Sequence, residues 1–234
     1  MNEKSKNGHL NLGNTAFMPK EELLDMAVKH RKISIGVPND KKNDEKRVAL
    51  TPEAVNLLVE TGNEVIVQKG AGSGANYSDK DYADNGALIS DSPARVYSAD
   101  AVIKVAPFTL QEADYLKGNQ IVMSFLNVLK LTEETLGKLI RKKVTAIALE
   151  KIRDSNGVMS VMESMSEISG VTSVLIASEY LSNQHGGKGV LLGGVTGVTP
   201  TEVVIIGANT AGEYAARAAL GLGSQVRIFD TSLH

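Results

Sequence analysis

The sequence predicts an α/β fold, in which a parallel-sheet domain is joined by a long helix to the beginning of a second α/β domain. Three observations support this prediction. Short apolar segments alternate with helix-forming segments from Lys32 onward, which is typical of a parallel sheet. Residues 160–183 keep apolar positions at helical spacing and contain no proline. A final strand, glycine-containing turn, helix and strand then follow in order.

The composition excludes several classes of protein. The 234 residues are 42% hydrophobic and 22% charged, which suits a folded chain of one large or two modest domains. Their net charge is −2 and no segment concentrates basic residues, so we expect no nucleic-acid partner. The absence of cysteine and the spacing of the four histidines predict no metal site. We find no signal peptide and no apolar run near the roughly 18 residues that span a bilayer, and expect a cytoplasmic protein without a membrane partner.

The first domain is predicted to cover residues 32–158, after an N-terminal extension over 1–31 that carries a short helix from Lys20. Its first strand is KISIGV, followed by a helix with Thr51 as its cap, Pro52 in its first turn and Gly62 at its end. The alternation of strands and helices continues in the segments NEVIVQK, DYADNGALI, ADAVIKV, QIVMSFL, TEETLGKLIRKK and VTAIAL. Helices between successive strands predict a parallel sheet.

A connecting helix is predicted over residues 159–184, and the second domain over 185–234. The second domain opens with the glycine-rich segment HGGKGVLLGGVTGVTP and continues with the strand TEVVIIG, the helix AGEYAARAALGLG and the strand QVRIFD. A complete doubly wound nucleotide domain needs about six strands. We therefore expect a Rossmann-type domain that is incomplete in this chain.

The turn from Gly207 to Gly212 has the layout of a dinucleotide-binding turn, although Asn209 stands where the pattern has its middle glycine. Helix N-terminal amides at such a turn bind a pyrophosphate. Asp230, at the end of the next strand, would accept hydrogen bonds from ribose hydroxyls and repel a 2′-phosphate, which favours NAD over NADP. An ordinary βαβ turn is the alternative. The predicted cofactor-binding residues of this region are Gly207, Asn209, Thr210, Ala211, Gly212 and Asp230.

A family resemblance rests on segments that stand in the expected order. They are GVPNDKKNDEKRVALTP, AVIKV, MSEISG, HGGKGVLLGGVTGV and VVIIGANTAG. Over about residues 32–234 the chain resembles the alanine dehydrogenase and pyridine nucleotide transhydrogenase superfamily, and is more similar to the alanine dehydrogenases. The resemblance implies NAD-linked oxidative deamination of L-alanine to pyruvate and ammonia, and assembly as a homo-oligomer.

The same resemblance implies the site residues. Arg47 and Lys104 match the cations that hold the substrate carboxylate, whereas Asn127 stands in place of the catalytic His. An amide cannot exchange a proton near neutral pH, so proton transfer is left to Lys104, to water or to a side chain outside this sequence. Glu150 matches an acid near the substrate pocket, and Ser166 a serine near the nicotinamide. A surface cation, a solvated strand-end carboxylate and a solvent-facing serine are the alternatives for Arg47, Glu150 and Ser166.

Other functions stay open at this point. Because Asn127 differs from the family pattern, a transhydrogenase-like or saccharopine-type NAD(P) oxidoreductase remains an alternative. A non-catalytic module that binds a nucleotide or a carboxylate is another. The activity of the 234-residue chain by itself is also open.

Overall fold

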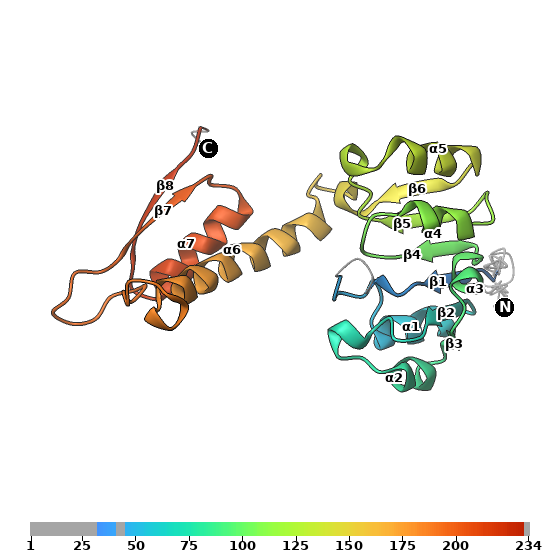
Figure 1. The fold of residues 1–234 in the computed structure, drawn as a ribbon, viewed down its shortest axis with the longest axis horizontal. Helices are drawn as coiled ribbons and strands as arrows, with labels where there is room; N and C mark the ends of the chain where they lie inside the picture. Colours follow the sequence, from blue (N-terminus) through green and yellow to red (C-terminus); the bar gives the residue numbers. More distant parts are fainter. Residues whose placement is uncertain (1–31, 41–44, 232–234) are drawn as a thin grey trace, which may run out of the picture. The chain divides into compact units, whose positions relative to one another are not determined.

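The computed structural model describes residues 32–40 and 45–231, shown in Figure 1. The short helix predicted in the N-terminal extension lies outside these residues. In the described part of the chain, no helix is both long enough and apolar enough to cross a membrane.

The first part of the described chain is a six-stranded parallel sheet with strand order β3-β2-β1-β4-β5-β6. The strands are β1 (Ser34–Val37), β2 (Glu64–Gln68), β3 (Leu88–Ser90), β4 (Ala101–Ile103), β5 (Ile121–Ser124) and β6 (Thr145–Ala148). The chain winds outward in one direction from β1 to β3 and in the other from β4 to β6, so the winding reverses between β1 and β4. Ligands of such sheets bind in the crevice at the carboxyl ends of the strands at this reversal.

The helices between the strands confirm the predicted α/β alternation. They are α1 (Pro52–Glu60), α2 (Asp79–Asp84), α3 (Pro93–Tyr97), α4 (Leu110–Tyr115) and α5 (Glu133–Arg141), with short 3-10 turns η2 (Ser73–Ala75), η3 (Val128–Lys130) and η4 (Leu149–Lys151). The Thr51 hydroxyl accepts a hydrogen bond from the Ala54 amide at 3.3 Å, and Gly62 has φ +89° just beyond α1. The cap and the stop signal therefore act as the sequence predicts.

Strand β4 is shorter than predicted, and Lys104 lies directly after it. The prediction placed Lys104 inside the strand. The Lys104 amide still donates to the Met123 carbonyl at 3.0 Å, but the Val105 and Ala106 amides donate to the Asp40 carboxylate instead of to a neighbouring strand. This side-chain acceptor ends the strand and turns the chain at the edge of the sheet.

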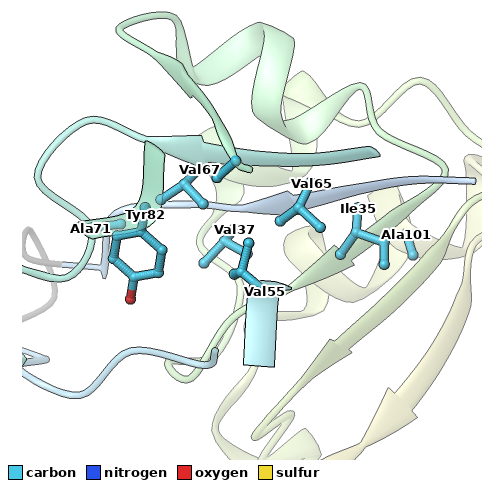
Figure 2. Close-up of a cluster of buried hydrophobic side chains, with 9 residues drawn as sticks. Ile35, Val37, Val55, Val65, Val67, Ala71, Tyr82 and Ala101 are labelled. Atoms are coloured by element: carbon cyan, nitrogen blue, oxygen red, sulfur yellow. The ribbon is translucent and has the colours of Figure 1, made fainter. Parts of the chain in front are cut away.

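Two apolar clusters cover the two faces of the sheet. One cluster places Val65 and Val67 of β2 against Val55 of α1 and Tyr82 of α2, as Figure 2 shows. The other packs residues of β4 and β5 against α4 and α5, and contains Tyr97, Val102, Phe108, Ala113, Leu116, Val122, Leu126 and Leu139. Adjacent residues Ala101 and Val102 belong to different clusters because successive strand side chains point to opposite faces. The strands β1 and β2 are therefore buried on both faces, whereas the edge strands β3 and β6 are partly exposed.

The second part of the described chain contains α6 (Ser160–Leu181), η5 (Asn183–His185), β7 (Glu202–Ile206), α7 (Thr210–Gly221) and β8 (Gln225–Phe229). Strands β7 and β8 pair in parallel from Glu202↔Gln225 to Ile206↔Phe229. Helix α6 confirms the predicted long helix, and it packs closely on α7 (Figure 1). A Cβ at Gly170 of α6 would lie 2.3 Å from the Ala211 carbonyl oxygen, so only glycine permits this crossing.

Gly36 of β1 requires the absence of a side chain, which gives a test of the fold. A Cβ at Gly36 would lie 2.1 Å from the Val96 carbonyl oxygen of α3. We expect Gly36→Ala to lower the free energy of unfolding by about 1–3 kcal/mol, because the backbone of α3 must move away. Urea denaturation measures this change.

Gly137→Ala is the matched control, because its Cβ would lie 3.4 Å from the flexible end of Arg141 on α5. Alanine at that helical position should raise the free energy of unfolding, by up to about 1 kcal/mol. Equal stabilities of the two variants would contradict the close approach of α3 to β1.

Candidate functional site

Four of the predicted site residues follow the carboxyl ends of neighbouring strands. Arg47 lies between β1 and α1, Lys104 directly follows β4, Asn127 follows β5, and Glu150 follows β6. Because all these strands are parallel, their carboxyl ends meet at one edge of the sheet. This edge includes the reversal between β1 and β4, where a ligand crevice is expected.

Lys104 is enclosed at this edge, and its side chain has no exposed surface. The Lys104 Nζ lies 2.9 Å from Asp40 Oδ1 and 2.8 Å from Glu112 Oε2, and 5.1 Å from the centroid of the Phe108 ring. A buried ammonium must be paired, and here two carboxylates and an aromatic face surround it. The ammonium group therefore faces groups of this chain.

The two carboxylates that pair with Lys104 also accept hydrogen bonds from backbone amides. Asp40 Oδ2 accepts hydrogen bonds from the Val105 and Ala106 amides at 2.9 and 3.1 Å. Glu112 Oε2 accepts from the Thr109 amide at 2.8 Å and completes the capping box of α4. The ion-paired cluster of Asp40, Lys104 and Glu112 therefore joins the chain after β1, the chain after β4 and the start of α4.

Sequence reasoning missed Asp40 and Glu112. The spacing of Thr109 and Glu112 is that of a capping box and would have identified Glu112 as a helix-start residue. No comparable local signal identifies Asp40, because its partners are more than sixty residues away. Burial raises the pKa of Glu112, but the Lys104 ammonium and the hydrogen bonds from Lys104, Thr109 and Tyr97 together outweigh it, so this pKa lies below its ordinary value of 4.5.

Arg47 lines an open cavity of about 650 Å³. Its guanidinium donates from Nε to Glu45 Oε1 at 2.8 Å and from Nη2 to Glu45 Oε2 at 2.7 Å, and its Cζ lies 5.6 Å from the centroid of the Phe125 ring. This pairing lowers the pKa of Glu45 and raises that of Arg47. The described residues of the wall are Glu45, Arg47, Val105, Ala106, Pro107, Phe108, Thr109, Leu110, Phe125, Lys130, Leu131, Thr132, Glu134 and Thr135.

Arg47 and Lys104 are thus not brought to one cavity, since Lys104 is not among the described residues of the wall. The residues that follow it, Val105 and Ala106, do line the cavity, and Asp40 fixes both of their amides. In this structure, Lys104 therefore acts on the cavity through the backbone that it helps to position.

Asn127 and Glu150 are brought together by hydrogen bonds after β5. The Glu150 carboxylate accepts hydrogen bonds from the Asn127 amide at 2.8 Å and the Leu126 amide at 3.2 Å. Asn127 has φ +41°, a left-handed conformation that asparagine adopts more readily than most residues. Glu150 therefore braces the turn after β5, and Phe125 and Lys130 on either side of Asn127 line the cavity.

The predicted dinucleotide turn forms between β7 and α7. Gly207 has φ +105° with open space around its missing side chain, and a Cβ at Gly212 would lie 1.9 Å from the Gly207 carbonyl oxygen. Asn209 caps α7, with its Oδ1 accepting from the Gly212 amide at 3.1 Å, and Thr210 and Ala211 begin the helix. The turn therefore has the two glycines that its geometry needs, and Asn209 is accommodated as a helix cap.

Asp230 lies beside this turn at the end of β8, where its carboxylate accepts a hydrogen bond from the Ala208 amide. A cavity of about 360 Å³ is lined there by Ile206, Gly207, Phe229, Asp230 and Thr231. A turn with glycine at its first and last positions, a helix N-terminus and an adjacent carboxylate suit the pyrophosphate and ribose of a dinucleotide. The residues present therefore fit NAD.

Ser166 is half-buried on α6, and its proximity to a nicotinamide stays a prediction. Within residues 32–40 and 45–231, no group of three or more His, Asp or Glu side chains could hold a metal ion.

Comparison with known proteins gives matches over both parts of the chain. The family model described as "Alanine dehydrogenase/PNT, N-terminal domain" matches residues 36–169, and the corresponding C-terminal domain model matches residues 173–234. An alanine dehydrogenase of Staphylococcus saprophyticus is 41% identical over 199 residues, which are 85% of this chain and 53% of that protein. The chain thus spans about half the length of the curated relatives it matches.

Two solved structures also superpose on most of this chain. An L-alanine dehydrogenase structure superposes with a TM-score of 0.80 at 40% identity, over 86% of this chain and 55% of that chain. A transhydrogenase structure from Sinorhizobium meliloti superposes with a TM-score of 0.75 over 86% of this chain and 59% of that chain. Its identity of 24% makes it evidence for the fold alone.

Removal of the Lys104 charge tests whether this residue supports the fold. We expect Lys104→Met to lower the free energy of unfolding by about 3–5 kcal/mol, because two buried carboxylates lose their counter-ion. Lys117→Met is the control, since Lys117 pairs with Asp100 at the surface and should contribute less than about 1 kcal/mol. Urea denaturation compares both with the unchanged chain. A Lys104→Met variant as stable as Lys117→Met would exclude a supporting role.

Acid should weaken the same cluster. The pKa of Glu112 is lower in the folded chain than its ordinary value of 4.5, so the unfolded chain binds more protons as the pH falls below that value. The contribution of Glu112 to stability is therefore complete above pH 4.5 and is lost below it. Glu112→Gln should reduce the slope of unfolding free energy against pH in this acid range. Glu133→Gln, an exposed change on α5, serves as the control, and equal slopes for the two variants would contradict the assignment.

Proposed function

The chain belongs to the alanine dehydrogenase/PNT family, and from that premise we propose that it forms the substrate-binding part and the beginning of the cofactor-binding part of an NAD-dependent alanine dehydrogenase. The reaction is oxidative deamination of L-alanine to pyruvate and ammonia, and reductive amination in reverse. The observation that supports it most directly is Arg47 on the wall of an open cavity at the carboxyl edge of a doubly wound sheet.

The Arg47 guanidinium binds the substrate carboxylate. Glu45 already engages Nε and Nη2 through two parallel hydrogen bonds, which is the geometry that a guanidinium offers to any carboxylate. Arginine has five N–H donors, and a second carboxylate would take Nη1 in place of the Met165 sulfur, a weak acceptor to which Nη1 donates at 2.9 Å. The Phe125 ring keeps the guanidinium plane in place beside the cavity.

The turn between β7 and α7 holds the cofactor. The amides at the start of α7 bind the pyrophosphate, Gly207 presents no side chain to it, and Gly212 lets the helix pack closely against the turn. Asp230 accepts hydrogen bonds from the ribose hydroxyls and repels a 2′-phosphate, which selects NAD. When bound, the nicotinamide supplies the hydride acceptor.

Asn127 orients the substrate or a water molecule by hydrogen bonding, and Glu150 keeps its backbone in position. An amide does not transfer protons near neutral pH, so the proton passes to water or to a side chain outside this sequence. Lys104 remains a third candidate, and its ammonium would have to leave its pairing with Asp40 and Glu112 to take part. Ser166 on α6 lies toward the nicotinamide, as the family pattern implies. Homo-oligomeric assembly and a cytoplasmic location complete the proposal.

The assay of the full-length protein with L-alanine and NAD tests this function. We expect NADH formation that depends on L-alanine, and a KM for L-alanine that rises about 10- to 100-fold in Arg47→Lys, because lysine cannot reproduce the bidentate contact. Arg95→Lys on the exposed side of α3 is the matched control and should leave the KM unchanged.

Three outcomes would contradict parts of the proposal. Turnover of another amino or keto acid in place of L-alanine would favour a different oxidoreductase of this superfamily. NADP preference would contradict the role of Asp230. Nucleotide binding without any turnover would favour a non-catalytic module.

A further inference from the structure

We propose that the glycine-rich loop at residues 70–76, which follows β2, positions Arg47 for its contact with the substrate carboxylate, and that it does so through Gly74. This inference rests on the proposed function, because Arg47 is the substrate-binding residue of that proposal. Gly74 is absent from the site residues that the sequence predicts. It is a positioning residue, since it acts on the substrate only through Arg47.

The segment that carries Arg47 has little backbone support of its own. Residues 45–48 belong to neither a helix nor a strand, and the Arg47 amide donates to the Glu45 carboxylate at 3.0 Å instead of to a carbonyl group. No hydrogen bond joins the backbone of residues 45–48 to the backbone of another described residue. The position of the Arg47 backbone therefore depends on what packs against this segment.

Gly74 packs directly against the segment. A Cβ at Gly74 would lie 2.6 Å from the Lys46 carbonyl oxygen and 2.8 Å from the Lys46 Cα. This carbonyl belongs to the peptide group that joins Lys46 to Arg47, and Glu45, the ion-paired partner of Arg47, precedes it. A side chain at Gly74 would therefore press on the backbone between Glu45 and Arg47.

The loop itself is held firmly, so it can serve as a fixed support. The Gly70 amide donates to Asp79 Oδ1 at 2.7 Å, and the Ser73 hydroxyl donates to the Gly70 carbonyl at 2.8 Å. A Cβ at Gly72 would lie 2.6 Å from the Tyr82 ring, which belongs to the buried cluster of Figure 2. The loop is therefore anchored to α2 and to the core of the first domain.

The segment of Arg47 has open space on both sides. Glu45 and Arg47 line the 650 Å³ cavity, whereas Glu45 and Lys46 line a second cavity of about 450 Å³, whose other described lining residues are Asn39, Gly70, Ala71, Ser73 and Gly74. Residues 45–47 thus form a thin wall between two cavities, and Gly74 supports that wall from the side of the loop. A segment with space beside it shifts more easily than a close-packed one. We therefore expect a Cβ at Gly74 to displace Arg47 and not the loop.

Steady-state kinetics of the full-length protein tests this role by the addition of one methyl group. In Gly74→Ala we expect the KM for L-alanine and for pyruvate to rise about 10- to 100-fold, because a displacement of about 1 Å has effects of this size, while the KM for NAD stays unchanged. Gly118→Ala is the matched control, since its Cβ would lie 2.9 Å from the Lys142 carbonyl oxygen at the amino end of β5. It should lower the free energy of unfolding without a change in any KM.

A double-substitution cycle shows whether Gly74 acts through Arg47. In an Arg47→Lys background, we expect Gly74→Ala to raise the KM for L-alanine by about twofold or less, because a flexible lysine depends little on the placement of its backbone. An equal rise in the two backgrounds would overturn the inference.

Calorimetric binding of pyruvate, with NADH present and ammonium absent, separates this inference from the proposed function. Weaker binding to Gly74→Ala than to Gly118→Ala supports the inference even if the protein shows no turnover of L-alanine. Equal affinities of the two variants would overturn the inference alone. Absence of pyruvate binding to the unchanged protein would overturn both.

If Gly74→Ala does not fold, Ser73→Ala tests the same loop without an added atom. It removes the hydrogen bond from the Ser73 hydroxyl to the Gly70 carbonyl and so loosens the support of residues 45–47. Ser98→Ala is the matched control, because it removes a similar bond of 2.7 Å to the Arg95 carbonyl after α3. Weaker pyruvate binding to Ser73→Ala than to Ser98→Ala supports the inference, and equal binding would overturn it.

Discussion

The buried ion-paired cluster of Asp40, Lys104 and Glu112 is the interaction on which the first domain and its cavity depend. It lies where the winding of the sheet reverses, at the carboxyl ends of the paired strands β1 and β4. A buried charge is costly unless every partner is in place, so the cluster favours one arrangement over its alternatives. Through Asp40 it holds the Val105 and Ala106 amides that form part of the cavity wall. The same three side chains therefore contribute to the stability of the first domain and to the geometry of its cavity.

Most of the fold could be predicted from local signals in the sequence. Thr51 and Pro52 mark the start of α1, and Gly62 its end, because capping and the left-handed conformation are properties of single residues. The strand order β3-β2-β1-β4-β5-β6 was not predicted, since it depends on contacts between segments far apart in the chain. The early end of β4 escaped prediction for the same reason, because a carboxylate from the β1 side replaces a strand partner.

The candidate site was predictable in its parts but not in its arrangement. The turn around Gly207 and Gly212 and the acid at Asp230 follow a sequence pattern whose geometry is local, and the structure forms it. The family resemblance implies that Lys104 is a substrate-binding cation, and the structure adds that its ammonium is paired with Asp40 and Glu112, two partners that the sequence did not reveal. A pattern can show that a charge needs a partner. Only the three-dimensional arrangement shows which partner it has.

The crossing of α6 and α7 at Gly170 has a consequence for how the nucleotide turn responds to its surroundings. The carbonyl that faces Gly170 belongs to Ala211, within the first turn of α7. The long helix is therefore a rigid backing for the peptide groups that would receive a pyrophosphate. A sliding of this helix along its axis would press on the backbone of Ala211 and Ala215, so the helix and the nucleotide turn are coupled through direct packing.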